Sequence, residues 1–206
     1  MATLLLIHGG LWEDMDADRF WRRPGVVAGL EGLGCVVVAP DRLRLASSWA
    51  DEAAHVASAV SGTGAPVTVV GGSFGCAAAV RLALSHPGLV QRLVLAWPAA
   101  LSDQFVAIRV RAGLARLGAR AGVLDALLGG GVVPGASDAE VRGLSVPVGV
   151  LPSVPPNPVH PRSAVDALLR LLPSAVELPG CPEAPRPEFQ PNLESFLATI
   201  VAFAEL

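Results

Sequence analysis

The sequence predicts a single α/β domain built on a mostly parallel sheet of about six strands. Short apolar segments alternate along the chain with longer segments of helical periodicity, which is typical of βαβ units. The strand segments are nearly all apolar, as expected for strands that helices cover on both faces. The 206 residues are 52% apolar, so one domain can bury a core without disulfides or metal. We therefore assign residues 1–206 to one domain.

Each element follows from this alternation of apolar and helical segments. The predicted strands are Thr3–His8, Cys35–Ala39, Val67–Gly71, Leu89–Trp97, Val146–Leu151 and Ala175–Leu178. The predicted helices are Ala17–Leu33, Ser47–Val60, Phe74–Ser85, Arg162–Leu172 and Asn192–Ala204. Pro24 is expected to break or kink the first helix, because proline lacks the N–H that a helix interior needs.

One interval interrupts the alternation between strand and helix. Residues 99–143 have helical spacing and contain no strand pattern. Ligands of open α/β folds bind at the carboxyl ends of the strands, where an insertion after a strand is well placed to cover them. We therefore predict that this helical insertion is a lid.

Composition narrows the class of protein and its partners. All 15 basic residues are arginine, the net charge is −3, and no basic patch stands out, which argues against nucleic acid. No apolar run is long enough to span a membrane, and the N-terminus lacks a signal peptide's basic region. The three cysteines form neither a disulfide framework nor a metal pair. We expect a cytoplasmic, bacterial protein with a small-molecule apolar ligand and no cofactor; a homodimer stays open.

The strongest local signal is Gly71-Gly72-Ser73-Phe74-Gly75, between an apolar strand and a helical segment. This G-x-S-x-G pattern predicts a nucleophile elbow, a sharp turn whose serine takes strained backbone angles. The alternative is a glycine-rich turn with a serine that caps the helix. The N–H groups at the start of the helix would face a developing oxyanion.

The segment His8-Gly9-Gly10 follows the first predicted strand, and Pro40-Asp41 follows the second. With the elbow, these segments give the whole chain a resemblance to the α/β-hydrolase superfamily, beginning at the third strand of that fold. The resemblance implies an oxyanion hole formed by the N–H groups of Gly10 or Leu11 and of Phe74. His8 is expected to have a structural role in this loop.

The resemblance also implies a serine, then an acid, then a histidine along the chain. The acid is expected in the loop 151–161, which contains no Asp or Glu and has Pro156 or Asn157 at that place. The histidine is expected after the last strand, and the chain has none there. The sequence therefore predicts an incomplete triad.

Substitutes for the missing groups are few. His160 is the candidate base, with an inert loop histidine as the alternative. Asp103 is a weak candidate for the acid, with a helix cap as the favoured role. Glu183 stands where the histidine is expected and could face Ser73, although a carboxylate is a poor base for a hydroxyl. The cluster Glu13-Asp14-Asp16-Asp18 lacks the spacing of a metal site, so no metal is expected.

Two hypotheses for function remain open, and a third has less support. Trp12 and Trp97 follow strands and are expected to line an apolar pocket. The first hypothesis is a serine hydrolase that acts on a small apolar ester or thioester through Ser73. The second is a triad-deficient protein that binds an apolar ligand or catalyses a non-hydrolytic step. A protein-interaction role for the lid has only the missing triad in its favour.

Overall fold

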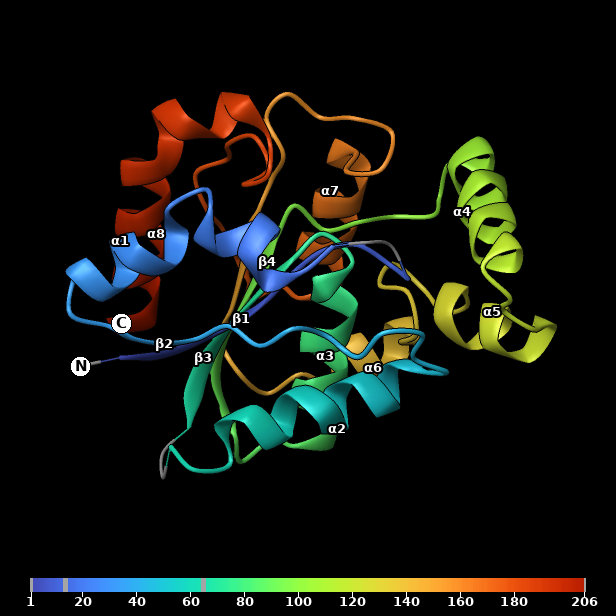
Figure 1. The fold of residues 1–206 in the computed structure, drawn as a ribbon, viewed down its shortest axis with the longest axis horizontal. Helices are drawn as coiled ribbons and strands as arrows, with labels where there is room; N and C mark the ends of the chain where they lie inside the picture. Colours follow the sequence, from blue (N-terminus) through green and yellow to red (C-terminus); the bar gives the residue numbers. More distant parts are fainter. Residues whose placement is uncertain (1, 13–14, 64–65, 206) are drawn as a thin grey trace.

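The computed structural model describes residues 2–12, 15–63 and 66–205, which form a six-stranded sheet between layers of helices (Figure 1). All the strand pairs are parallel, and the strand order is β2-β1-β3-β4-β5-β6. The strands are β1 Thr3–Ile7, β2 Val36–Val38, β3 Val67–Gly72, β4 Val90–Ala96, β5 Val148–Leu151 and β6 Val176–Glu177. This architecture confirms the predicted fold class, and each strand falls within a residue or two of its expected place.

Helices connect the successive strands, a last helix follows β6, and together they cover both faces of the sheet. They are α1 Val26–Gly32, α2 Trp49–Val60, α3 Gly75–Ser85, α4 Gln104–Arg116, α5 Ala121–Leu128, α6 Asp138–Arg142, α7 Arg162–Leu171 and α8 Leu193–Glu205. Two shorter turns, η1 Asp18–Arg22 and η2 Pro187–Asn192, precede α1 and α8. The break between η1 and α1 spans Pro24, as the sequence predicts.

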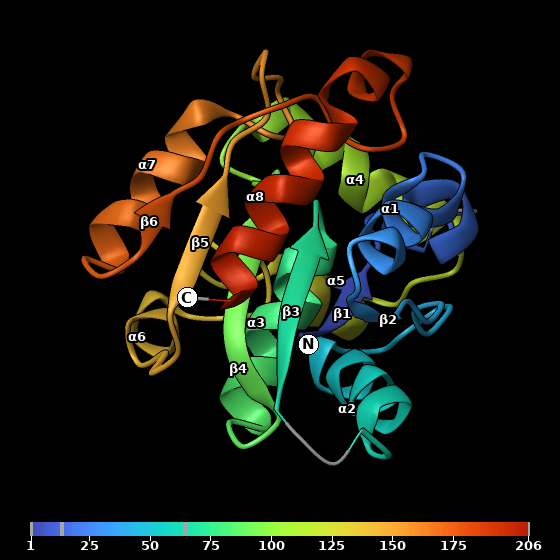
Figure 2. The same ribbon diagram turned by 90° about the vertical axis from the view of Figure 1, so that its left-hand side faces the viewer.

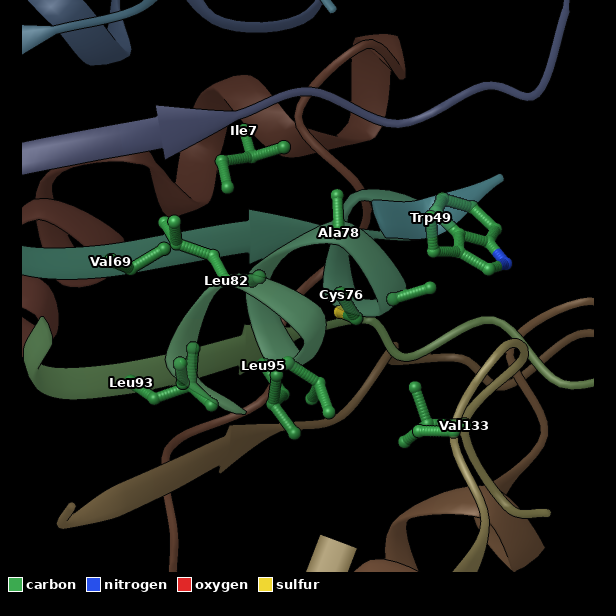
Figure 3. Packing of buried hydrophobic residues seen from close by; sticks show 14 of the residues in the cluster. Ile7, Trp49, Val69, Cys76, Ala78, Leu82, Leu93, Leu95 and Val133 are labelled. Carbon is green, nitrogen blue, oxygen red and sulfur yellow. The ribbon is translucent and has the colours of Figure 1, made fainter. Parts of the chain in front are cut away.

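Alternation along the strands divides the core into two clusters. In β1, Leu5 and Ile7 pack with α2 and α3, whereas Leu4 and Leu6 pack with α1 and α8. Figure 3 shows the first cluster, in which side chains of β1, β3 and β4 meet Leu82 of α3. Both faces of β3 and β5 are completely buried and those of β1 and β4 mostly so, which explains their continuous apolar runs, whereas the edge strands β2 and β6 are partly exposed.

The interval between β4 and β5 contains α4, α5 and α6, as its helical spacing predicts. In Figure 1, α4 and α5 lie together at one end of the molecule, at a distance from α1 and α8. Figure 2 shows α8 in front of the sheet and α4 behind its upper end. Within the described part of the chain, no helix has the length and apolar character needed to cross a membrane.

The core makes a simple prediction about stability. Leu95 of β4 is completely buried, so Leu95→Ala should lower the free energy of unfolding by about 2–5 kcal/mol. Ile108→Ala on α4, where the side chain is 57% exposed, is the control and should change it by less than about 0.5 kcal/mol. Urea unfolding of both variants measures the difference. Equal losses in the two variants would contradict the assignment of Leu95 to the core.

Candidate active site

Ser73 occupies the turn between β3 and α3 with a φ of 55°, a left-handed conformation that is rare for residues other than glycine. The residues two positions before and two positions after Ser73 must be glycine. A Cβ on Gly71 would lie 2.7 Å from the carbonyl oxygen of Gly75, and a Cβ on Gly75 would meet the carbonyls of Ile7 and His8. The turn therefore has the strained serine and close backbone contacts of a nucleophile elbow.

His160 comes from the loop after β5 and lies beside this serine. Its Nε2 atom is 2.8 Å from Ser73 Oγ, which is hydrogen-bond distance. The assignment of His160 as the base requires this distance. The imidazole side chain is only 12% exposed, so the surrounding protein restricts its orientation.

Glu183, in the loop after β6, binds the other side of the imidazole. Its Oε1 atom is 2.6 Å from His160 Nδ1, and the carboxylate is 7% exposed. Ser73, His160 and Glu183 thus form one continuous hydrogen-bonded chain. The expectation that the triad is incomplete is wrong in this respect, because a carboxylate does face the histidine. Glu183 contacts His160 and not Ser73.

Several donors converge on the Glu183 carboxylate. Asn157 Nδ2 lies 2.6 Å and Ser153 Oγ 3.0 Å from Oε1, while Arg186 Nε lies 2.6 Å from Oε2. Burial raises the pKa of Glu183, but the hydrogen bonds from His160, from its own backbone amide and from Ser153 outweigh it. The pKa falls to about 2. Glu183 is therefore a carboxylate at neutral pH.

This carboxylate determines the tautomer of the histidine. An ionised carboxylate only accepts hydrogen bonds, so the neutral His160 ring carries its proton on Nδ1, directed at Glu183. Nε2 then has a free lone pair toward Ser73 Oγ, as a general base requires. In this tautomer the 3.2 Å approach of Asn157 Nδ2 to His160 Nδ1 is a contact between two donors.

Asn157 holds the loop that carries His160. Its Oδ1 atom accepts hydrogen bonds from the backbone N–H groups of Val159 and His160, each at 3.0 Å. Its Nδ2 atom donates to Glu183. One amide side chain therefore fixes both the histidine backbone and the carboxylate. This residue stands where the resemblance places the acid.

The loop after β1 lies next to the elbow. His8 is buried: its Nδ1 atom lies 2.8 Å from the Gly9 carbonyl, and its Nε2 accepts the N–H of Arg42 at 2.9 Å. Burial lowers its pKa to about 4, so His8 is neutral and structural, as the sequence analysis expects. Gly10, Leu11 and Phe74 border the same cavity as Ser73 and His160.

Arg42, which no sequence pattern indicates as a site residue, binds backbone carbonyls of this loop. Its Nη1 atom donates to the carbonyls of His8 at 3.1 Å and Gly10 at 2.6 Å. Its Nε and Nη2 atoms bind both oxygens of Glu52, at 2.5 and 2.7 Å. The two side chains are 5% and 1% exposed, so this is a buried, bidentate ion pair.

The cavity beside Ser73 has a volume of about 440 Å³. This open cavity is bordered by the loop after β1, the elbow, the His160 loop, Arg186 and one side of α4. Its apolar lining consists of Leu11, Phe74, Val110, Leu114, Leu117 and Val159. The predicted lid insertion thus contributes α4 to the wall of the cavity.

Asp103 is not the acid partner of His160. It caps α4: its Oδ1 atom accepts the N–H groups of Phe105 at 2.8 Å and Val106 at 3.0 Å. The serine-aspartate pair at the start of a helix is explained by this cap.

The two tryptophans expected to line the pocket also lie elsewhere. Trp97 is completely buried, stacks on Phe196 at 5.4 Å and donates its indole N–H to the Cys181 carbonyl. Trp12 donates its indole N–H to the Ala46 carbonyl at 2.9 Å. Neither is among the residues that border the cavity at Ser73.

The described residues contain no group of three or more His, Cys, Asp or Glu that could hold a metal ion. Glu13 and Asp14 of the acidic cluster lie outside the described residues. Cys35, Cys76 and Cys181 are free thiols and buried.

The Arg42–Glu52 pair makes a prediction about stability. Arg42→Met leaves the Glu52 carboxylate buried without a partner and should lower the free energy of unfolding by about 3–5 kcal/mol. Arg42→Met combined with Glu52→Leu removes both charges, so it should be more stable than the single variant. Denaturant unfolding at neutral pH compares the two. A double variant no more stable than Arg42→Met would show that the unpaired charge is not the cause.

No family model matches the sequence, and comparison with curated proteins finds no match. Solved structures do resemble the chain. A meta-cleavage product hydrolase from Pseudomonas fluorescens has a TM-score of 0.70 at 19% identity, covering 98% of this chain and 90% of that one. An extracellular α/β-hydrolase from a Paenibacillus species has a TM-score of 0.71 at 14% identity, covering all of both chains. An esterase from Exiguobacterium antarcticum has a TM-score of 0.70 at 12% identity, covering 100% of this chain and 92% of that one.

These neighbours match the chain over nearly its whole length, which includes its parallel sheet and the flanking helices. The chain therefore has the α/β-hydrolase fold.

Proposed function

We propose that the protein is a serine hydrolase that cleaves a carboxylic ester or thioester through an acyl-enzyme at Ser73. The observation that carries this proposal is the hydrogen-bonded chain from Ser73 through His160 to Glu183, with distances of 2.8 and 2.6 Å. A base that is itself oriented by a third group is the arrangement that activates a serine hydroxyl. The hydrolases and the esterase among the structural neighbours support the same chemistry.

In the proposed reaction, Ser73 Oγ attacks the substrate carbonyl carbon while His160 Nε2 takes the hydroxyl proton. The tetrahedral intermediate collapses, His160 returns the proton to the leaving oxygen or sulfur, and an acylated Ser73 remains. Water then attacks this ester with His160 again as base, which releases the carboxylic acid and restores the serine.

The oxyanion of the intermediate needs N–H donors near Ser73. We assign this role to the backbone N–H groups of Phe74 and of Leu11 or Gly10. Phe74 precedes the first turn of α3, where the helix dipole favours negative charge. Neither Phe74 nor Leu11 has a backbone acceptor for its N–H among the described residues, which leaves both amides available to substrate.

The cavity supports a small acyl group with an apolar part. Six apolar side chains line it, and its volume of about 440 Å³ lies in the range of small-molecule sites. We further propose that the insertion of residues 99–143 serves as a lid, because α4 closes one side of this cavity. Exclusion of water by such a cover would strengthen the interactions at the oxyanion.

The hydrogen-bonded chain favours an enzyme over the alternative of a ligand-binding protein without a triad. A protein that only binds an apolar ligand does not need a buried carboxylate that binds the imidazole and three further side-chain donors. Burying such a charge requires this set of partners, and their arrangement directs the carboxylate at the imidazole.

A fluorophosphonate probe tests the proposal directly. Wild-type protein should be labelled on Ser73, identified by peptide mapping, because an activated hydroxyl attacks the phosphorus centre. Ser73→Ala should not be labelled, and His160→Ala should react at least about 100-fold more slowly, since the general base is lost. Protein that is shown to be folded by circular dichroism but carries no label would overturn the proposal.

Substitution of Glu183 tests the third member of the chain. Glu183→Gln removes the charge that orients the imidazole and should lower kcat for p-nitrophenyl butyrate on the order of 10⁴-fold. Asp103→Asn, which keeps a good helix cap, should leave kcat within about twofold. Glu188→Gln, which removes an exposed negative charge five residues along the chain, is a second control. A kcat that falls with Asp103→Asn but not with Glu183→Gln would reverse the assignment of the acid.

A further inference from the structure

Two arginines of α4 face the cavity at Ser73 without an acidic partner. Arg109 and Arg116 both border it, and neither forms an ion pair with a described carboxylate. Arg116 makes only a long, 3.3 Å hydrogen bond to the Ala112 carbonyl of its own helix. The two guanidinium groups are therefore available to a ligand.

Their spacing places them along one side of the cavity. Seven residues correspond to nearly two helical turns, so Arg109 and Arg116 share a face of α4 and lie roughly 10 Å apart along its axis. Val110 and Leu114 border the same cavity from the same helix, and Leu117 borders it from the residue directly after the helix. The helix thus presents apolar side chains and two cations together.

The charges around the cavity are of one sign. Of the charged residues in the described chain that border it, all are arginines: Arg109, Arg116 and Arg186. Arg186 is neutralised by Glu183 at 2.6 Å, so Arg109 and Arg116 supply the net positive charge. The whole chain has more acidic than basic residues, 18 against 15, so this excess is local. A concave surface lined by one sign of charge concentrates ligands of the opposite sign.

Arg111, the third arginine of α4, lies away from the cavity and has an acidic partner. It binds Asp125 of α5 at 2.8 Å and does not border the cavity. Of the three arginines of α4, one is therefore held in an ion pair, and the two without an acidic partner among the described residues border the cavity at Ser73.

We propose that the substrate hydrolysed at Ser73 carries an anionic group, a carboxylate or a phosphate, which binds Arg109 and Arg116 of α4. This inference rests on the proposed function and extends it. The expected substrate is then an acyl ester or thioester with an apolar part near Phe74 and Leu11 and a negative charge near α4. Guanidinium groups suit this role because they bind carboxylate and phosphate oxygens with two parallel N–H donors.

The anion could belong to the acyl group or to the leaving group, and two matched pairs of substrates separate these sources. The first pair is mono-p-nitrophenyl adipate and its neutral methyl ester, which differ only in a carboxylate on the acyl side. The second pair is butyryl-coenzyme A and butyryl-N-acetylcysteamine, which share the thioester, but the leaving group of the first also carries phosphates, an adenosine and a pantoyl unit. The measured quantity is the ratio of kcat/KM for the charged substrate to that for the neutral one. For the second pair, the change in the ratio caused by the arginine variants, compared with Arg111→Gln, therefore isolates the effect of the charge.

In at least one pair, the wild-type protein should prefer the charged substrate. Arg109→Gln and Arg116→Gln should each lower that ratio by about fivefold, the size expected for one partly exposed ion pair. The double variant should lower it further, and added salt should lower the wild-type ratio because exposed charges are screened. Arg111→Gln removes the same charge from the same helix away from the cavity, and it should leave the ratio unchanged.

The outcomes separate the two proposals. Loss of the preference in the adipate pair assigns the anion to the acyl group, and loss in the coenzyme A pair assigns it to the leaving group. Suppose that the neutral substrates are hydrolysed, but that the kcat/KM ratios do not change in the Arg109 and Arg116 variants, or fall equally in Arg111→Gln. Such a result would overturn the anionic substrate and leave the hydrolase proposal standing. No hydrolysis of any substrate, with no fluorophosphonate label on Ser73, would overturn the hydrolase and with it this inference.

Discussion

Ser73 reaches the cavity because Gly75 lets the first turn of α3 lie directly on the end of β1. A side chain at Gly75 would collide with the carbonyls of Ile7 and His8, and one at Gly71 with the carbonyl of Gly75. The close approach fixes the left-handed backbone of Ser73 and brings the loop after β1 beside it. The packing of α3 against the sheet thus maintains the strained backbone conformation of Ser73.

The loops after β5 and β6 supply the other two groups in the reverse of the order that the resemblance implies. His160 lies in the loop where the acid is expected, and Glu183 lies where the histidine is expected. A hydrogen-bonded chain of three side chains depends on which atoms face each other and not on the order of the residues in the sequence. Two loops that emerge from neighbouring parallel strands can therefore exchange these roles and still align Glu183, His160 and Ser73.

Much of the fold could be predicted from the sequence, because strand and helix patterns and the elbow are local. The pairing of His160 with Glu183 joins residues 23 positions apart across two proline-rich loops, and no local pattern encodes it. The sequence places Glu183 near the site with Ser73 as its expected neighbour, but in the structure the carboxylate lies against the imidazole of His160. Trp97 shows the opposite difficulty: an apolar residue at a strand end can fill a pocket or the core. Trp97 fills the core: its backbone has a positive φ, and its ring is buried against Phe196.

Arg42 is the residue that local patterns were least able to reveal, since an arginine after a strand is usually solvated. Its burial makes sense only with Glu52, ten residues later on α2, and with the two carbonyls that it binds. The pair fixes one side of the loop that carries Gly10 and Leu11, while Ser73 and α3 fix the other. In the proposed reaction, donors held in this way would need no reorganisation when negative charge develops next to them.

The low pKa of Glu183 has a consequence for the proposed reaction. When His160 takes the proton of Ser73, the ring becomes a cation between the oxyanion and a carboxylate whose pKa is about 2. A group that holds protons so weakly does not take the Nδ1 proton from the imidazolium, so the positive charge stays on the ring beside the intermediate. The donors from Ser153, Asn157 and Arg186 keep Glu183 ionised. They therefore act on the reacting atoms through the histidine, although none of them bonds Ser73.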